Sequence, residues 1–134
     1  MKNRYLLDTH TFLWATGDES VAPKLSYLVR DTIEEPETEL LVSAVTLYEI
    51  TNKHRKGKLP KFGRIAENYM EALTGLDAIE LPLTWEHTHL AGSMDLPNKD
   101  PFDRMLAAQA ITEDLILITC DKAFEGAPGL TTLW

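Results

Sequence analysis

The chain has 134 residues, of which 44% are hydrophobic and 25% are charged, and it contains 7 Gly and 7 Pro. This length and composition predict one folded domain, residues 1–134, that buries most of its apolar surface and has no long disordered arm. The formal net charge of −8 excludes a protein that coats nucleic acid by bulk electrostatic attraction, but it permits local contacts with a phosphate chain.

The single cysteine, Cys120, cannot form an internal disulfide, so nothing in the sequence indicates an oxidising compartment. The apolar run that begins at Tyr5 stops at Asp8, which is too short for the core of a signal peptide. No segment approaches the roughly 18 apolar residues of a membrane span. We therefore expect a cytoplasmic protein that makes no contact with a membrane.

Apolar runs alternate with helical patterns along the chain. In order, the sequence predicts strands at residues 5–7, 40–43, 79–81, 115–119 and 131–134, and helices at residues 21–33, 45–56, 65–73, 85–90 and 101–111. Continuously apolar strands separated by helices predict an α/β fold, with a mostly parallel central sheet of four or five strands flanked by helices. Ligands of such folds bind at the carboxyl ends of the strands.

Five acidic residues lie at the carboxyl ends of the predicted strands or on the helices that follow them. Asp8 ends the first strand, and Asp121 follows the fourth. Glu49 lies on the helix that follows the second strand, and Asp100 and Asp103 lie on the first turn of the helix at 101–111. Because the carboxyl ends of parallel strands meet at one edge of the sheet, we expect these five side chains to lie near one another.

Each acid also has a purely structural explanation. Asp100 before a proline is a typical N-cap, and Asp103 in the first turn complements the helix dipole. Glu49 follows Thr46 at the spacing of a capping box, although Ser43 is the more natural N-cap. Asp8 and Asp121 each have the alternative of simply opening a loop. The structural explanation has to hold independently at every position, whereas one shared site explains all of them.

Carboxylates that share a partly dry site repel one another, and a hard divalent cation removes that conflict. Mg2+ prefers oxygen ligands, keeps several waters and usually binds one or two carboxylates together with phosphate oxygens. Such an ion acidifies a water molecule and stabilises charge that grows on phosphorus. The combination predicts hydrolysis of phosphodiester bonds.

Four segments resemble, in this order and at these separations, the PIN-domain ribonucleases, and specifically the VapC-type toxins of bacterial toxin-antitoxin pairs. They are YLLDTH, VSAVTLYEI, DPFDRMLAAQA and LITCD, and the similarity extends to the terminal LTTLW. The resemblance implies a PIN-like fold and an endoribonuclease that depends on Mg2+ or Mn2+. It places the four acids of the family on Asp8, Glu49, Asp103 and Asp121.

The resemblance also assigns supporting residues and partners. Asp100 is the additional acid of the DPFDR branch and is expected to support metal binding, and Thr119 is expected to form a hydrogen bond within the site. A metal-activated water is the implied nucleophile, with a 5′-phosphate and a 3′-hydroxyl as products. The implied partners are an RNA substrate, a second copy of the chain in a homodimer, and a cognate antitoxin whose tail brings an arginine to the carboxylates.

Six of the 13 Lys and Arg residues lie within residues 53–64, and two interpretations of them stay open. Cations near a helix C-terminus favour the helix dipole, and the rest of the segment would then be a solvated loop. Alternatively the segment grips RNA phosphates, and the candidate contacts are Lys53, Arg55, Lys56 and Lys58. Arg104 is a further candidate RNA contact, although a salt bridge to a neighbouring acid explains it slightly better.

Two rival functions compete with metal-dependent cleavage. One is a phosphotransfer enzyme that uses Asp8 as a covalent nucleophile, but the haloacid dehalogenase type has a second Asp where this chain has His10. The other is a catalytically silent PIN-like module that binds RNA or a partner protein.

The remaining residues give no sign of another kind of site. No zinc-ligand spacing and no dinucleotide-binding glycine motif is present. Trp14, Trp85 and Trp134 are expected in the core or a dimer interface, and Cys120 in buried packing.

Overall fold

The structure is a computed structural model that describes residues 3–134. Five strands form one sheet in the order β3-β2-β1-β4-β5, and every neighbouring pair is parallel. The strands are β1 (Arg4–Leu7), β2 (Glu39–Ser43), β3 (Ile79–Leu81), β4 (Ile116–Ile118) and β5 (Thr132–Leu133). The predicted α/β class with a parallel sheet is thereby confirmed.

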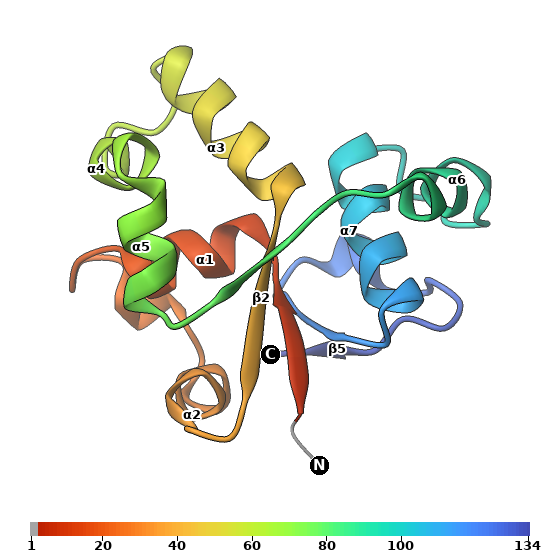
Figure 1. Ribbon diagram of the computed structural model, residues 1–134, viewed down its shortest axis with the longest axis horizontal. Coiled ribbons are helices and arrows are strands. Elements are labelled where there is room, and N and C mark those ends of the chain that lie inside the picture. The colour runs from red at the N-terminus through yellow and green to blue at the C-terminus, as the bar shows by residue number, and fades with distance from the viewer. Residues whose placement is uncertain (1–2) are drawn as a thin grey trace.

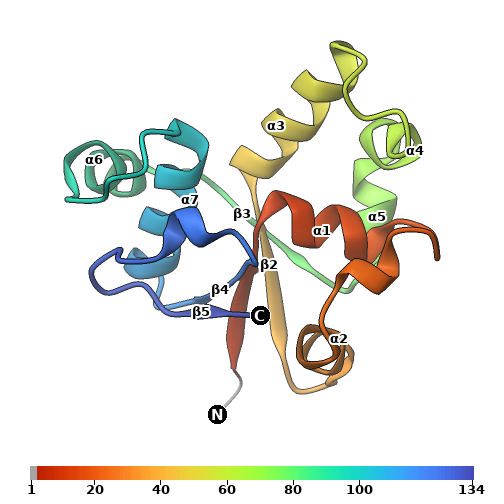
Figure 2. The same ribbon diagram turned by 180° about the vertical axis from the view of Figure 1, so that it is seen from behind.

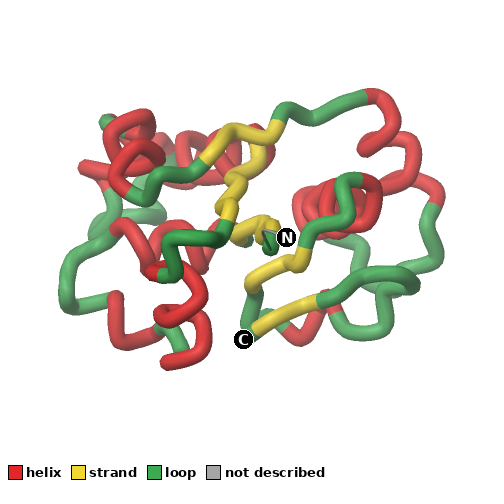
Figure 3. The backbone as a smooth tube through the Cα atoms, turned by 60° about the horizontal axis from the view of Figure 1, so that its bottom comes forward, coloured by secondary structure: helices red, strands yellow, loops and turns green. Residues whose placement is uncertain are grey.

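Helices cover both faces of this sheet (Figure 1; Figure 2). One layer contains α1 (Thr9–Thr16), α2 (Tyr27–Glu34), α3 (Ala44–Arg55), α4 (Gly63–Glu67) and α5 (Tyr69–Gly75). The other contains α7 (Pro101–Thr112), with α6 (Trp85–Ser93) packed against it. Figure 3 shows the twisted strands between the two groups of helices. Within residues 3–134, no helix has the length and apolar character needed to cross a membrane.

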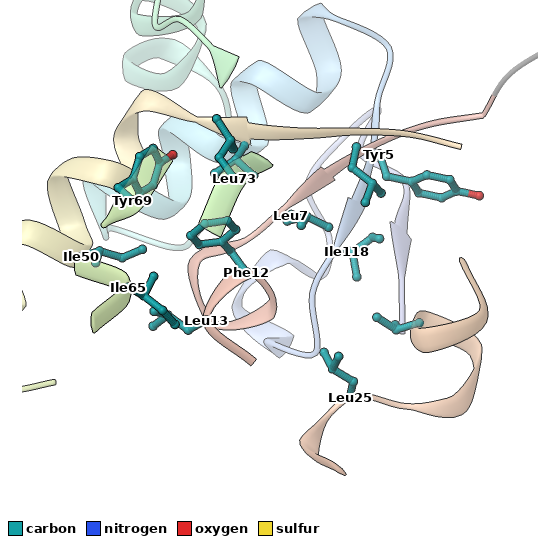
Figure 4. Close-up of a cluster of buried hydrophobic side chains, with 13 residues drawn as sticks. Tyr5, Leu7, Phe12, Leu13, Leu25, Ile50, Ile65, Tyr69, Leu73 and Ile118 are labelled. Atoms are coloured by element: carbon teal, nitrogen blue, oxygen red, sulfur yellow. The ribbon is translucent and has the colours of Figure 1, made fainter. Parts of the chain in front are cut away.

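The core consists of two hydrophobic clusters, one on each face of the sheet. Alternation along β1 divides its side chains between them, because Tyr5 and Leu7 join the cluster under α1, α2, α3, α4 and α5, whereas Leu6 joins the cluster under α7. Figure 4 shows the first cluster. Leu6 and Leu7 are fully buried, and each such side chain stabilises the fold by roughly 1.5–3 kcal/mol.

The strand order creates a switch point beside β1. From β1 the chain proceeds outward through β2 to β3, and it then returns to the opposite side of β1 to form β4 and β5. Connections therefore leave β1 and β4 in opposite directions at their carboxyl ends. Ligands of open parallel sheets bind at such a point, and Asp8 is the residue that follows β1 there.

Helix α1 is an element that the sequence patterns do not predict. It begins directly after β1, and Asp8 caps it by accepting a hydrogen bond from the Thr11 backbone N–H at 2.8 Å. Its hydrophobic residues do not form a clean helical stripe, since Thr9 and Thr11 are buried together with Phe12 and Leu13. A helix buried on several sides lacks the amphipathic period on which sequence prediction depends.

Two of the predicted helices are each divided. The segment at 21–33 becomes a short 3-10 turn, Ala22–Lys24, followed by α2, because Ser26 starts a new helix by capping the Val29 N–H. The segment at 65–73 becomes α4 and α5, which join at Asn68, whose side-chain amide donates to the Arg64 carbonyl. Such local side-chain bonds compete with helix continuation.

Other boundaries follow the sequence closely. Ser43 rather than Thr46 is the N-cap of α3, as its position suggested, and α7 begins at Pro101 after the Asp100 cap.

The tryptophans differ in burial. The expectation that Trp85 lies in the core is wrong, since this side chain is 94% exposed. Trp14 and Trp134 are partly buried and pack edge to face with ring centroids 5.9 Å apart.

We predict that His87→Ala lowers the unfolding temperature by several degrees, because it removes two interactions of a fully buried side chain. The His87 Nδ1 accepts from the Thr84 N–H at 3.0 Å, and its Nε2 lies 2.9 Å from the Glu113 carboxylate. Loss of one buried partner typically costs about 1–3 kcal/mol. Thermal unfolding followed by circular dichroism measures the effect. His89→Ala, an exposed change on the same helix, is the control, and equal shifts in both variants would contradict the prediction.

Candidate functional site

Asp8 lies at the centre of the candidate site and is only 5% exposed. Its backbone continues the pairing of β1 with β4, since the Asp8 N–H donates to the Ile118 carbonyl at 3.2 Å. One carboxylate oxygen accepts from the Thr11 N–H, and the other accepts from the Thr119 hydroxyl at 2.5 Å. The orientation of this carboxylate is therefore fixed by two neighbouring segments.

Thr119 connects Asp8 to the segment that carries Asp121. Its hydroxyl donates to Asp8 and accepts from the Asp121 backbone N–H at 3.0 Å. Asp121 is exposed, and one of its carboxylate oxygens caps a short 3-10 turn, Lys122–Phe124, through the Ala123 N–H at 2.9 Å. Thr119 thus forms the hydrogen bond within the site that the family resemblance implied for it.

Glu49 reaches the same region from α3. One oxygen of its carboxylate accepts from the Thr9 hydroxyl at 2.5 Å, and Thr9 is the residue next to Asp8. The other oxygen pairs with the Lys53 ammonium at 3.1 Å, one helical turn further along α3. Thr9 also contacts the Thr46 hydroxyl at 3.3 Å. The two threonines link the start of α1 to α3, and Glu49 thereby binds the residue that follows Asp8.

Asp103 adds a fourth carboxylate from the first turn of α7. Burial raises the pKa of Asp103, and the negative charges of Asp100, Asp121 and Glu49 raise it further. A hydrogen bond from the Asn98 side-chain amide, 2.9 Å long, acts in the opposite direction and lowers this pKa. Asp103 therefore experiences the charges of acids carried by two other elements. We call Asp8, Glu49, Asp103 and Asp121 the acidic cluster.

Asp100 has the capping role that its sequence position suggested. One of its oxygens accepts from the N–H groups of Phe102 and Asp103, at 2.8 and 3.1 Å, and the residue is exposed. Its carboxylate lies close enough to raise the pKa of Asp103. The observed contacts of Asp100 are those of a helix cap at the border of the acidic cluster.

The donor chemistry of the acidic cluster suits a hard divalent cation. Among residues 3–134, no three His, Cys, Asp or Glu side chains already form a set that could hold a metal ion. Mg2+ does not need such a set, because it usually binds one or two carboxylates and retains several waters. A carboxylate oxygen with one hydrogen bond keeps a further lone pair for a cation, so Asp8 fits this role despite its two contacts.

A larger cavity elsewhere is not the site of this chemistry. It measures about 540 Å3 and lies against α1, α4 and α5, where Lys61, Arg64 and Glu71 line it together with apolar residues. None of the four acids of the cluster lines it. The position of the carboxylates, rather than cavity size, therefore identifies the candidate site.

The basic candidates for RNA contact fall in different surroundings. Lys53 is paired with Glu49 at the acidic cluster, whereas the Arg55 guanidinium donates to the Asn52 side chain at 2.6 Å. Lys56 and Lys58 are exposed at and beyond the C-terminal end of α3. At 1.5 Å per residue, Lys56 lies roughly 10 Å further along the helix than Glu49. The segment therefore runs away from the acids along one helix.

Within residues 3–134, Arg104 forms no salt bridge with a neighbouring acid, and its contact with RNA stays a prediction. Its guanidinium donates four hydrogen bonds to backbone carbonyls, at 2.6–2.9 Å, and these belong to Ala91, Met94, Leu96 and Asn98. The side chain thus binds the connection between α6 and α7. Sequence spacing gives no sign of this, because the four acceptors are backbone groups of a loop.

Cys120 is exposed, so the expectation of buried packing is wrong. Partial burial raises the pKa of its thiol, and the charges of Asp8 and Asp121 raise it further. A thiol with a raised pKa remains protonated and is a poor nucleophile. Its location next to the acidic cluster therefore does not indicate covalent catalysis.

Sequence reasoning missed two residues that contact the acids. Thr9 binds Glu49, and Asn98 binds Asp103. The position of Thr9 immediately after Asp8 was a usable signal, since it shares the carboxyl edge of the sheet. Asn98 lies in a loop five residues before Asp103, and no periodic pattern relates the two.

The PIN domain family profile matches residues 5–130, and the chain belongs to this family. Among solved structures, the chain is similar to VapBC from Salmonella typhimurium bound to DNA, with 18% identity, a TM-score of 0.70 and coverage of 99% of this chain and 98% of that chain. It is also similar to VapBC2 from Rickettsia felis bound to a promoter DNA fragment, with 17% identity, a TM-score of 0.65 and 97% coverage of both chains. A comparison with curated proteins gives no match.

We predict that Asp103→Asn raises the unfolding temperature by a few degrees at neutral pH. The raised pKa means that the folded state binds this proton more tightly than the unfolded state, so ionisation of Asp103 costs stability. That cost is absent below the ordinary pKa of 3.8 and grows until the pH exceeds the raised folded pKa. Asparagine removes the charge and still accepts from Asn98.

Thermal unfolding of both proteins from acidic to neutral pH is the measurement. The stability difference should narrow as the pH falls, because the wild-type carboxyl then becomes protonated. Asp31→Asn, an exposed change on α2, should show no such trend. A variant that is less stable than wild type at neutral pH would contradict the account of Asp103.

Proposed function

We propose that the protein is an endoribonuclease that depends on Mg2+ or Mn2+ and acts as the toxin of a toxin-antitoxin pair. The proposal is supported by the contacts at the switch point of a PIN-domain sheet. There Thr119 links Asp8 to the Asp121 segment, and the charges of Glu49 and Asp121 act on Asp103. Supporting it, the Salmonella typhimurium and Rickettsia felis structures with this fold contain VapBC. The chemistry of the site, rather than the fold alone, is the basis for the reaction.

Asp8 is the proposed principal metal ligand, because hydrogen bonds from Thr11 and Thr119 orient both of its carboxylate oxygens. Glu49, Asp103 and Asp121 are the proposed further ligands, bound directly or through water. Asp100 supports the charge of the site from its cap position. The bound ion supplies an acidified water and neutralises charge on the scissile phosphate. Thr119 keeps Asp8 and the Asp121 segment together while substrate binds.

The proposed RNA path follows α3 away from the acidic cluster. Lys53 pairs with Glu49 of the acidic cluster, and it would exchange this contact for a phosphate when substrate binds. Arg55, Lys56 and Lys58 would contact phosphates further from the cleavage point. These contacts add affinity and no base specificity, since phosphates carry no sequence information.

The proposed protein partner is an antitoxin with a basic tail. The net charge of −8 and the acidic cluster both favour a positively charged segment. An arginine of that segment would pair bidentately with the carboxylates and occupy the place of the metal. Inhibition and catalysis then compete for the same four side chains.

A second copy of the chain is the proposed occupant of an apolar surface beside the site. A pocket of about 340 Å3 is lined by Ala44, Val45, Tyr48, Leu83, Phe102 and Met105. Tyr48 is 57% exposed, and its ring centroid lies 5.6 Å from that of Phe102. Among residues 3–134, no charged side chain lines this surface, so it fits another apolar surface better than RNA or a basic tail.

We predict that Asp8→Asn lowers RNA cleavage by more than about 100-fold and leaves the fold intact. The change removes one ligand charge without changing side-chain size, and even indirect ligand contacts account for up to about 100-fold. Purified protein is incubated with a panel of RNAs in Mg2+, in Mn2+ or in EDTA, and the products are separated on gels. Asp31→Asn is the matched control and should cleave like wild type.

The outcomes of this assay separate the alternatives. Cleavage by Asp8→Asn, or undiminished cleavage in EDTA, would overturn the metal-dependent reaction. A wild-type protein that cuts no RNA in the panel would favour the catalytically silent module. A phosphorylated Asp8 recovered after the reaction would favour the covalent phosphotransfer alternative.

We predict that Tyr48→Ser weakens dimer formation by tenfold or more, because buried aromatic anchors commonly contribute at least about 2 kcal/mol to an interface. Sedimentation velocity over a range of concentrations measures the dimer dissociation constant. Tyr27→Ser is the matched control, since Tyr27 is an 83% exposed tyrosine on the distant α2. An unchanged dimer in Tyr48→Ser, or a monomeric wild type, would refute this surface as the dimer contact.

A further inference from the structure

Asn98 makes three contacts that converge on the acid-bearing segments. Its side-chain amide donates to the Asp103 carboxylate at 2.9 Å and approaches the Ala123 carbonyl at 3.5 Å. Its side-chain oxygen accepts from the Asp100 N–H at 2.9 Å. One side chain therefore joins the start of α7, which carries Asp103, to the turn that follows Asp121.

Arg104 holds the backbone of the loop that carries Asn98 through hydrogen bonds to its carbonyl groups. The guanidinium of Arg104 binds the carbonyl of Asn98 itself at 2.9 Å and those of Met94 and Leu96 at 2.6 Å. A fourth bond, to Ala91, ties the same group to the end of α6. The planar fork of arginine suits several acceptors at fixed positions, so the Asn98 backbone has little freedom.

We propose that Asn98 is a positioning residue, held by Arg104, that orients the Asp103 carboxylate toward the other acids of the cluster. This inference rests on the proposed function, because it assigns Asn98 to the metal site proposed there. The negative charges of Asp100, Asp121 and Glu49 act on Asp103, so they oppose any orientation that brings its carboxylate toward them. The hydrogen bond from Asn98 holds one oxygen and thereby directs the other.

The expected consequence is a weaker metal site when the Asn98 amide is lost. Hydrogen-bond partners of metal ligands typically contribute about 10-fold to 100-fold in metal affinity. The variant Asn98→Ser is informative because a serine oxygen can still accept from the Asp100 N–H two residues on, whereas it has no amide to reach Asp103. The loop contact is thus retained while the Asp103 contact is removed.

Isothermal titration calorimetry with Mn2+ alone measures the dissociation constant for wild type and Asn98→Ser. We expect the constant to rise by about 10-fold or more in Asn98→Ser. Asn68→Ser is the matched control, since the Asn68 amide donates to the Arg64 carbonyl, outside the acidic cluster, and Mn2+ binding should not change. Equal affinity of Asn98→Ser and wild type for Mn2+ would overturn the inference.

A measurement without metal separates this inference from the proposed function. The Asn98 side-chain amide protons are followed by nuclear magnetic resonance in wild type and in Asp103→Ala. We expect their signals to shift and to exchange faster with solvent in the variant, whereas the Asn68 amide signals stay in place. Unchanged Asn98 signals would refute its role. A wild type that binds no Mn2+ would refute the metal site, and these spectra would still decide whether Asn98 orients Asp103.

Discussion

The pairing of β1 with β4 is the constraint on which the candidate site depends. Leu7 pairs with Ile118, so the residues that follow, Asp8 and Thr119, leave adjacent strands side by side. The hydroxyl of Thr119 then reaches both Asp8 and the backbone of Asp121. A register shift of one residue would turn Asp8 toward the opposite face of the sheet and separate it from both.

Ionisation of Asp103 costs stability, and the other carboxylates of the acidic cluster have local partners. Asp8 is nearly buried and accepts two hydrogen bonds, whereas Glu49 is neutralised by Lys53 and oriented by Thr9. Asp103 is the least compensated member, because burial and neighbouring charges together raise its pKa. An arrangement that concentrates negative charge without a matching set of cations is a common property of functional sites. A divalent cation, or an arginine from a partner, would relieve this repulsion.

The sequence predicts those features that depend on periodicity and chain order. Apolar runs ending in Asp8 and Asp121 place both acids at the carboxyl edge of a parallel sheet, and the cap at Asp100 marks the start of α7. The sequence places Thr9 at the same edge, but its contact with Glu49 forms only in the tertiary fold. The contacts of Asn98 and Arg104 could not be predicted, because they depend on the conformation of an irregular loop that has no periodic pattern. Helix α1 escaped prediction for a related reason, since its buried threonines break the amphipathic pattern.

Location of a bound metal ion tests the central claim most directly. Crystals of the protein soaked in Mn2+ would be measured at a wavelength where manganese scatters anomalously. The account predicts an anomalous peak within bonding distance of the Asp8 carboxylate and of at least one other acid of the cluster, directly or through one water. The absence of a peak there in fully soaked crystals, or a peak only at a distant site, would contradict the proposed metal centre.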